Sequence, residues 1–173
     1  MEEALALIDQ LIQEHKQILQ RLQTTEQVAN DVGAILQLHR AKEDFVPGRF
    51  SDQKQGLQSL QDSLEAIDKG LQTHFDREEK RLLSVFEQYG GETLTSGLHF
   101  LLLEHQELKD RIAESKKEVA ELVATGLSRE VREGKAWGVR VYISHTRKLI
   151  EAHAQSEQEL FHKLRAELMR PKN

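Results

Sequence analysis

Residues 57–78 read LQSLQDSLEAIDKGLQTHFDRE, and this stretch carries the pattern that decides the fold of the chain. Its apolar residues recur at intervals of three and four, which is the spacing of one buried face of an α-helix. His74 and Glu78 continue the same face, because a step of four residues turns a helix by only ~40°. The stretch therefore predicts an amphipathic helix with an imidazole and a carboxylate on its buried side.

The same apolar spacing extends over nearly the whole chain and divides it into four segments. The first segment runs from Ile8 to near Leu38, and residues 45–49, FVPGR, then break the pattern. Proline cannot continue a helix interior, and the glycine beside it supplies a turn. Ser51 or Asp52 is a candidate N-cap for the second segment, which contains the stretch quoted above.

Glycine, threonine and serine mark the remaining boundaries. The second segment ends at Gly90 and Gly91 in the manner of a left-handed cap, the third opens at Thr93 or Thr95 and ends at Thr125 and Gly126, and the fourth opens at Ser128. Short connections between the later segments make those neighbours antiparallel. The prediction is an all-α chain, residues 1–173, folded as a single domain: an antiparallel up-down-up-down four-helix bundle.

Composition narrows the classes of function. The net charge of −5 provides no basic surface for nucleic acid. The chain has no cysteine, which excludes disulfides, thiolate ligands and thiol chemistry. No apolar run approaches the ~20 residues that a membrane span needs, and the acidic N-terminus lacks the basic start of a signal peptide. We therefore expect a cytoplasmic protein with no nucleic-acid or membrane partner.

One short pattern occurs twice along the chain. Glu14-His15 is followed by His74-x3-Glu78, and Glu104-His105 is followed by His153-x3-Glu157. Each histidine lies on the apolar face of its own segment. In the predicted bundle, His15 and His105 lie ~13 residues from the start of their helices, and the two His-x3-Glu pairs lie ~11–15 residues from the end of theirs. All six side chains then reach one level, ~20 Å from one end at 1.5 Å per residue.

Convergence at one buried level points to metal. Four imidazoles and two carboxylates without a metal would be left largely unpaired, at a cost of several kcal/mol. Imidazole with carboxylate suits first-row transition metals. The predicted metal ligands are His15, His74, Glu78, His105, His153 and Glu157.

Other candidates receive a different interpretation. A third match, His39-x3-Glu43, lies beside the proline break at the wrong level. His99 and His162 fall on the solvent side of their helices, and His145 is a candidate supporting or access residue. Glu14 and Glu104 could each orient an imidazole or lie on the surface, and the surface interpretation is slightly favoured.

The order His15, His74-Phe-Asp-Arg-Glu78, Glu104-His105, His153-Ala-Gln-Ser-Glu157 resembles the hemerythrin-like (HHE cation-binding) proteins over roughly residues 2 to 168. The resemblance implies two iron ions, oxo- or hydroxo-bridged, inside an antiparallel four-helix bundle. It also implies that Glu78 and Glu157 bridge the irons, with the distribution of histidines between them left open. Manganese or zinc remain alternatives.

The pattern departs from the oxygen-carrying hemerythrins, which have five histidines. Leu101 stands at the position of the fifth histidine. The oxygen carriers also have a His-x4-Asp pair on the fourth helix, where this chain has His153-x3-Glu157. Four histidines with two glutamates look like the branch that contains cluster-repair, iron-sensing and peroxide-consuming proteins. Repair proteins also carry a cysteine-containing N-terminal domain, which this chain lacks.

The functional hypothesis is a non-haem di-iron protein that binds, senses or reacts with a small diatomic gas or peroxide. Whether it is an enzyme stays open, with a peroxide- or NO-consuming oxidoreductase as one possibility and no catalytic residue assigned. The alternatives are an iron donor in iron–sulfur cluster repair or nitrosative-stress defence, and a metal-free helical scaffold. The pattern indicates no particular protein partner.

Overall fold

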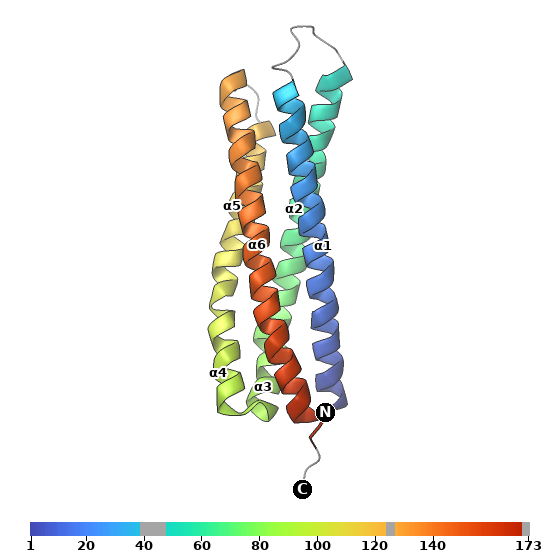
Figure 1. Cartoon of the computed structure of the whole chain (residues 1–173), viewed down its shortest axis with the longest axis vertical. Helices are drawn as coiled ribbons and strands as arrows, with labels where there is room; N and C mark the ends of the chain where they lie inside the picture. The colour runs from blue at the N-terminus through green and yellow to red at the C-terminus, as the bar shows by residue number, and fades with distance from the viewer. Residues whose placement is uncertain (39–47, 124–126, 171–173) are drawn as a thin grey trace.

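The computed structural model describes residues 1–38, 48–123 and 127–170, and every regular element in these ranges is helical. The helices form four rods (Figure 1). The elements are α1 (Glu2–Leu38), α2 (Gly48–Arg77), the π-helical turn η1 (Glu78–Leu82), α3 (Leu83–Tyr89), α4 (Gly91–Leu102), α5 (Glu104–Val123) and α6 (Arg129–Leu168). The second rod consists of α2, η1 and α3, and the third consists of α4 and α5.

Successive rods run in opposite directions, and α1 and α6 extend along the whole bundle (Figure 1). The first rod packs against α2 and α6, and α5 packs against α2 and α6 on the opposite side. The start of α1 and the end of α6 lie at the same end of the bundle. This arrangement confirms the predicted all-α, up-down-up-down four-helix bundle.

A glycine pair turns the chain between the second and third rods. Gly90 ends α3 with helical angles, and Gly91 follows with φ +64°, the left-handed conformation that glycine adopts most readily. The prediction that Thr93 or Thr95 opens the third segment was wrong, because α4 begins at Gly91 and contains both threonines. The Thr95 hydroxyl instead donates a hydrogen bond of 2.9 Å to the Phe86 carbonyl. The turn is therefore held by glycine on one side and by a threonine reaching back to α3 on the other.

Two predicted helix starts have different outcomes. Ser128 caps α6 as expected, since its hydroxyl accepts a hydrogen bond of 3.4 Å from the Val131 N–H. The prediction for α2 was wrong, because α2 begins at Gly48 and both Ser51 and Asp52 lie within its first turns. Glycine is unfavourable mainly in helix interiors, so a terminal glycine allows this earlier start. The His39-x3-Glu43 match lies outside the described residues.

Two interruptions of the rods were not predicted. The second rod changes to π-helical geometry over Glu78–Leu82, and the third rod is interrupted at Leu103, between α4 and α5. Both lie close in sequence to predicted ligands, Glu78 in the first case and His105 in the second. Helical periodicity alone does not reveal them, because the apolar spacing continues on both sides.

Buried apolar side chains form three clusters along the bundle. The terminal cluster lies at the end where α1 begins and includes Leu11, Phe86 and Phe161. The middle cluster includes Leu71 and Phe75, together with other residues of α1, α2, α5 and α6. The distal cluster includes Leu60 and packs residues closer to the other end. The predicted ligands occupy the level between the terminal and middle clusters.

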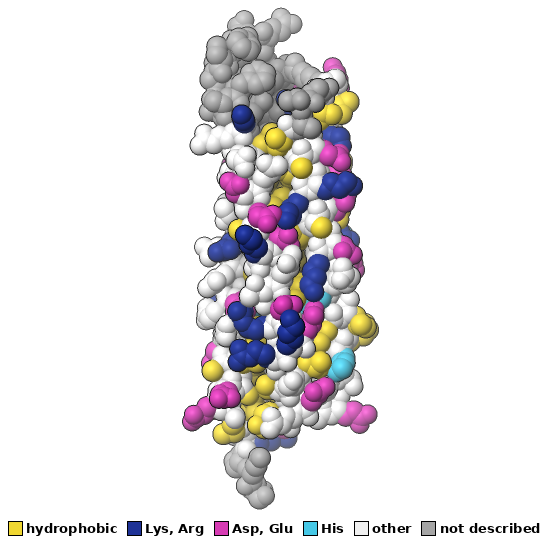
Figure 2. Space-filling view, turned by 180° about the vertical axis from the view of Figure 1, so that it is seen from behind, with side chains coloured by type: hydrophobic (Ala, Val, Ile, Leu, Met, Phe, Trp, Pro, Cys, Tyr) yellow, Lys and Arg dark blue, Asp and Glu magenta, His cyan; other side chains and the backbone are white. Residues whose placement is uncertain are grey.

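The surface is mixed in charge. Lysine and arginine side chains alternate with aspartate and glutamate over the face seen in Figure 2, and apolar side chains show between them. Among the described residues, no helix is both long enough and apolar enough to span a membrane.

Candidate metal centre

All four rods contribute to one buried level of polar side chains. The contributions are His15 from α1, His74 from α2, Glu78 from η1, His105 from α5, and His153 and Glu157 from α6. The four histidines are between 1 % and 5 % exposed, and both glutamates are fully buried. The structure thus brings together every residue that the sequence analysis proposed as a ligand. Their role as ligands stays a prediction.

The Glu78 carboxylate lies between two pairs of histidines. Its Oε1 atom is 3.1 Å from His74 Nε2 and 3.7 Å from His15 Nε2. Its Oε2 atom is 3.4 Å from His105 Nε2. The two oxygens of one carboxylate therefore face different imidazoles.

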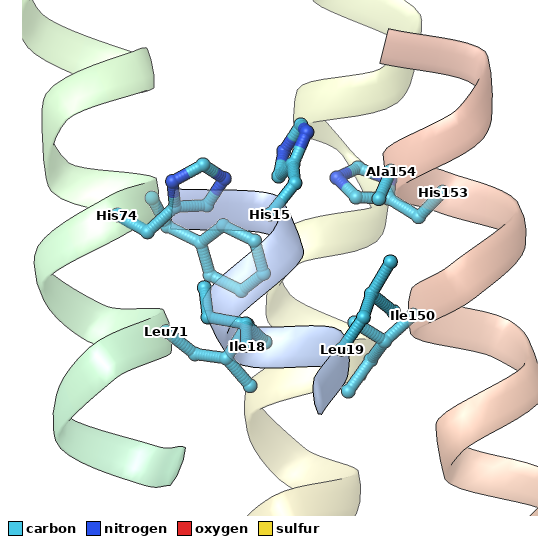
Figure 3. A pocket seen from close by; sticks show the side chains of 9 residues that line it. His15, Ile18, Leu19, Leu71, His74, Ile150, His153 and Ala154 are labelled. Atoms are coloured by element: carbon cyan, nitrogen blue, oxygen red, sulfur yellow. The ribbon is translucent and has the colours of Figure 1, made fainter. Parts of the chain in front are cut away.

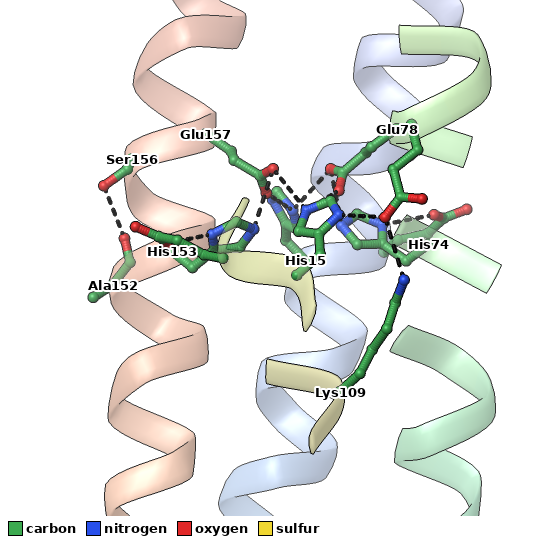
Figure 4. Close-up of polar contacts among 12 residues, drawn as sticks. His15, His74, Glu78, Lys109, Ala152, His153, Ser156 and Glu157 are labelled. Carbon is green, nitrogen blue, oxygen red and sulfur yellow. Dashed lines mark hydrogen bonds and ion pairs between the residues drawn. The ribbon is translucent and has the colours of Figure 1, made fainter. Parts of the chain in front are cut away.

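Glu157 repeats this arrangement from α6. Its Oε2 atom is 3.1 Å from His15 Nε2, while its Oε1 atom is 3.2 Å from His153 Nε2 and 3.7 Å from His105 Nε2. The carboxylates of Glu78 and Glu157 point toward each other among the imidazoles (Figure 4). Both glutamates are placed as ligands shared between two positions would be.

The polar atoms form two groups, each compatible with one metal ion. One group contains His15 and His74, the other contains His105 and His153, and both contain Glu78 and Glu157. Within each group the potential ligand atoms lie within 4.8 Å of one another. Ligands ~2.1 Å from a shared ion are ~3.0 Å apart at right angles and ~4.2 Å apart when opposite. The observed separations of 3.1–3.7 Å fall in this range.

These atoms also lack ordinary partners. Within the described ranges of the chain, the Nε2 atoms of all four histidines and both oxygens of Glu78 and Glu157 are buried without a hydrogen bond. Buried polar groups are usually hydrogen-bonded, and a cluster of exceptions requires an explanation. A pair of metal ions would satisfy all eight atoms at once, so the donor set fits the predicted cofactor.

Three of the histidines form a hydrogen bond to a carboxylate through Nδ1, the ring nitrogen that does not face the other candidate ligands. His74 Nδ1 donates to Glu14 at 3.0 Å, His153 Nδ1 donates to Glu104 at 2.8 Å, and His105 Nδ1 donates to Glu79 at 2.9 Å. An ionised carboxylate only accepts, so each bond places the proton on Nδ1 and leaves the Nε2 lone pair facing the centre.

The slightly favoured interpretation of Glu14 and Glu104 as surface acids was therefore wrong. Each side chain crosses to the His-x3-Glu helix of the neighbouring rod, and sequence adjacency to His15 or His105 does not show this. Glu14 also accepts hydrogen bonds from Arg77 and from Gln10. Burial opposes its charge, but the hydrogen bonds from His74 and Gln10 and the charge of Arg77 hold the pKa of Glu14 below its usual value.

Glu79 is a residue that sequence reasoning missed. Its Oε1 atom accepts from His105 and from Lys109, whose Nζ lies 3.3 Å away. Burial opposes the charge, and these two contacts outweigh it to lower the pKa of Glu79. A regular α-helix would turn Glu79 ~100° from Glu78. Both residues lie in η1, and π-helical turns often occur at functional sites.

Protonation of the metal-free centre follows from its charges. Burial disfavours the imidazolium of His15, but the carboxylates of Glu157 and Glu78 outweigh burial and raise the pKa of His15 to about 9. Burial likewise opposes the charge of Glu157, yet its contacts with His105, His15 and His153 hold the pKa of Glu157 well below its usual value. A proton on His15 therefore offsets part of the buried negative charge of the metal-free centre.

A small cavity adjoins the centre (Figure 3). Its volume is about 10 Å³, and it lies among His15, His74 and His153 on one side and apolar side chains on the other. The apolar lining consists of Ile18, Leu19, Leu71, Phe75, Ile150 and Ala154. A volume of this order holds about one water-sized molecule. The enclosed space beside the centre is thus about the size of one water molecule.

The remaining histidines lie apart from the six. His99 and His162 are exposed, as expected. His145 is also exposed, and its Nδ1 lies 3.3 Å from the Arg111 guanidinium. This contact with Arg111 does not connect His145 to the six candidate ligands, so it does not support the suggested role of His145 at the centre.

Comparison with known proteins places this sequence in a family. The sequence matches the Hemerythrin HHE cation binding domain over residues 6–165, a range that contains all six candidate ligands. No curated protein and no solved structure matches the chain.

Proposed function

The chain belongs to the hemerythrin HHE cation-binding family, since the match spans residues 6–165 of 173, and from this premise we propose that it holds two iron ions and binds or reacts with a small oxidant or gas. Membership implies cation binding. The observation that carries the finer proposal is the pair of buried donor groups that share Glu78 and Glu157. His15 and His74 would hold one ion, and His105 and His153 the other.

The donor set supports iron as the metal. Imidazole nitrogen mixed with carboxylate oxygen binds iron, manganese and zinc, and the chain has no cysteine to favour softer metals. Iron bound here would supply redox chemistry toward O₂, peroxide or nitric oxide. The protein's part is to fix the ligands, orient three imidazoles through Glu14, Glu79 and Glu104, and enclose the centre in apolar side chains.

The size of the adjacent cavity supports a small ligand. Its volume of about 10 Å³ is too small for an organic substrate. Phe75 and Ile150 line it together with His15, so a molecule that enters meets both apolar surface and the metal level. Of the ligand classes considered, dioxygen, nitric oxide and peroxide come nearest to this size.

The first experiment is elemental analysis of the purified protein after anaerobic loading with ferrous iron. We expect close to two iron atoms per chain. His74→Ala should lose iron and unfold at a lower temperature than the loaded wild type, because metal that binds only the folded state stabilises it. His162→Ala, which changes an exposed histidine, is the matched control. Wild-type iron content in the His74→Ala protein would show that the ligand assignment is wrong.

A second experiment separates the possible roles of the loaded protein. Repeated consumption of peroxide or nitric oxide would identify an enzyme, whereas reversible binding without turnover would identify a carrier or sensor. Transfer of iron to a cluster-free acceptor would support an iron donor. Absence of any metal after loading would leave the helical scaffold as the remaining hypothesis.

A further inference from the structure

We propose that the two metal positions are unequal, and that the ion beside His15 and His74 is bound more weakly and leaves first. This inference rests on the proposed function, since it requires two metal ions. Each position has two histidines and shares both glutamates, so the candidate ligands themselves are equal in number and type. The inference therefore concerns the hydrogen bonds to the Nδ1 atoms of the histidines.

The two halves of the chain correspond at the four histidines, at the two glutamates among the candidate ligands, and at two of the three supporting glutamates. His15 corresponds to His105, His74 to His153, Glu78 to Glu157, and Glu14 to Glu104. The residue after Glu78 is Glu79, but the residue after Glu157 is Gln158. The chain therefore supplies a third supporting carboxylate from the second rod and an amide at the matching place in the fourth.

The difference in residue type is matched by a difference in hydrogen bonding. His105 Nδ1 donates to Glu79 at 2.9 Å. His15 Nδ1 is buried and, within the part of the chain that the structure describes, forms no hydrogen bond with any protein group. Both rings stack on a phenylalanine, His15 on Phe161 with centroids 5.8 Å apart and His105 on Phe75 with centroids 3.9 Å apart, so the hydrogen bond to Nδ1 is what distinguishes them. A stacked ring retains rotational freedom in its plane that a hydrogen bond to Nδ1 removes.

The backbone differs at the same place. Glu78 and Glu79 lie in the π-helical turn η1, whereas Glu157 and Gln158 lie within the uninterrupted α-helix α6. The π-helical turn carries Glu78 at the centre while Glu79 contacts His105 from the side. The matching segment of α6 has no such turn, and His15 has no such contact.

Because carboxylates form hydrogen bonds with both histidines of one position and with only one histidine of the other, the two positions should bind metal with different affinity. Both histidines of the pair His105 and His153 are held by carboxylates, but only His74 is held in the pair His15 and His74. Loss of one supporting partner of this kind typically costs ~10–100-fold in metal affinity. We expect the dissociation constants of the two positions to differ by about this factor, with the weaker position next to His15.

Partial removal of metal tests the proposal directly. Full-length protein loaded with two iron ions is treated with a chelator until one ion per chain remains, and anomalous scattering from crystals locates it. We expect the remaining ion between His105 and His153. Residual iron beside His15 and His74, or equal occupancy of both positions, would overturn the inference. Failure to load two ions would instead overturn the proposed function.

Substitutions of the supporting carboxylates provide a second test. In Glu79→Gln, the slower phase of metal release to a chelator should accelerate ~10–100-fold toward the faster one. The double variant Glu79→Gln/Glu104→Gln should reverse the order of release, because Glu14 still holds His74. Glu87→Gln, an exposed residue of α3, is the control and should leave both phases unchanged. Unchanged release from the Glu79→Gln protein would contradict the role of Glu79.

Discussion

At the scale of single residues, the most unusual feature is the charge state of His15. Its two carboxylate neighbours raise its pKa from 6.5 to about 9, so at neutral pH the metal-free protein holds a proton there. A ligand imidazole is neutral, and a metal ion must displace this proton to bind. The raised pKa also means that the proton stabilises the metal-free fold fully below pH 6.5, and that this contribution is lost as the pH rises through about 9.

Metal affinity should therefore increase with pH between neutrality and about 9. Calorimetric titration with Zn²⁺ at pH 7, in buffers with different ionisation heats, should show release of at least one proton per chain. The His162→Ala protein should release the same number. A binding heat that does not depend on the buffer would show that His15 is already neutral in the metal-free protein.

Ala154 should control access of small molecules to the centre. It lines the cavity beside His15, His74 and His153 and is 4 % exposed. Ala154→Leu should fill this space, keep the metal content of the wild type and slow the reaction of the ferrous protein with nitric oxide. The extra methyl groups should cost ~1–3 kcal/mol of stability.

Stopped-flow spectroscopy would measure this rate, with Ala113→Leu on the exposed face of α5 as the control. An unchanged rate in a fully loaded Ala154→Leu protein would exclude the cavity as the site of approach.

The sequence identified the six central residues because each lies on an apolar face, and the spacing of four keeps each His-x3-Glu pair on that face. It did not identify Glu79, because a regular helix would turn that residue away from the centre. The roles of Glu14 and Glu104 depend on contacts between different rods, which residue spacing within one helix cannot determine.

At the scale of helices, two glycines should respond to alanine with opposite signs. Gly91 has φ +64°, and the left-handed conformation costs other residues ~1–2 kcal/mol. Gly134 lies exposed within α6, and a methyl group there would meet no neighbour within 4 Å. Alanine should therefore favour the helix at Gly134 by ~0.5–1 kcal/mol.

Chemical denaturation of Gly91→Ala and Gly134→Ala would measure both changes in the free energy of unfolding. The first protein should be less stable than the wild type and the second more stable. A stabilising effect at Gly91 would mean that the turn between the second and third rods has another conformation in solution.

Helix limits were predictable where glycine or a capping serine marks them, as at Gly91 and Ser128. They were not predictable at η1 and Leu103, because both interruptions preserve the apolar face on either side.

At the scale of the whole molecule, the metal level separates the terminal cluster from the other two clusters. Leu60 is 1 % exposed and belongs to the distal cluster, several turns of α2 from His74. Leu60→Ala should lower the free energy of unfolding by ~2–5 kcal/mol, through lost burial and the cavity that remains. Iron content per folded chain should stay at the wild-type value.

Denaturant titration and elemental analysis of the same sample would test this separation. Loss of iron from a folded Leu60→Ala protein would show that packing in the distal cluster determines the geometry of the centre. The all-α bundle was predictable at this scale because four apolar faces of similar length leave few other ways to bury them.

The start of α1 and the end of α6 lie at the same end of the bundle (Figure 1), and residues of both helices belong to the terminal cluster. His15 follows the start of α1 by about four turns, and Glu157 precedes the end of α6 by about three. The start of α1 and the end of α6 therefore each lie ~20 Å or less along the axis from the centre. A fluorescent dye attached at either end would be close enough for bound iron to quench it. The chain could thus report its own metal occupancy optically, in real time and with every ligand intact.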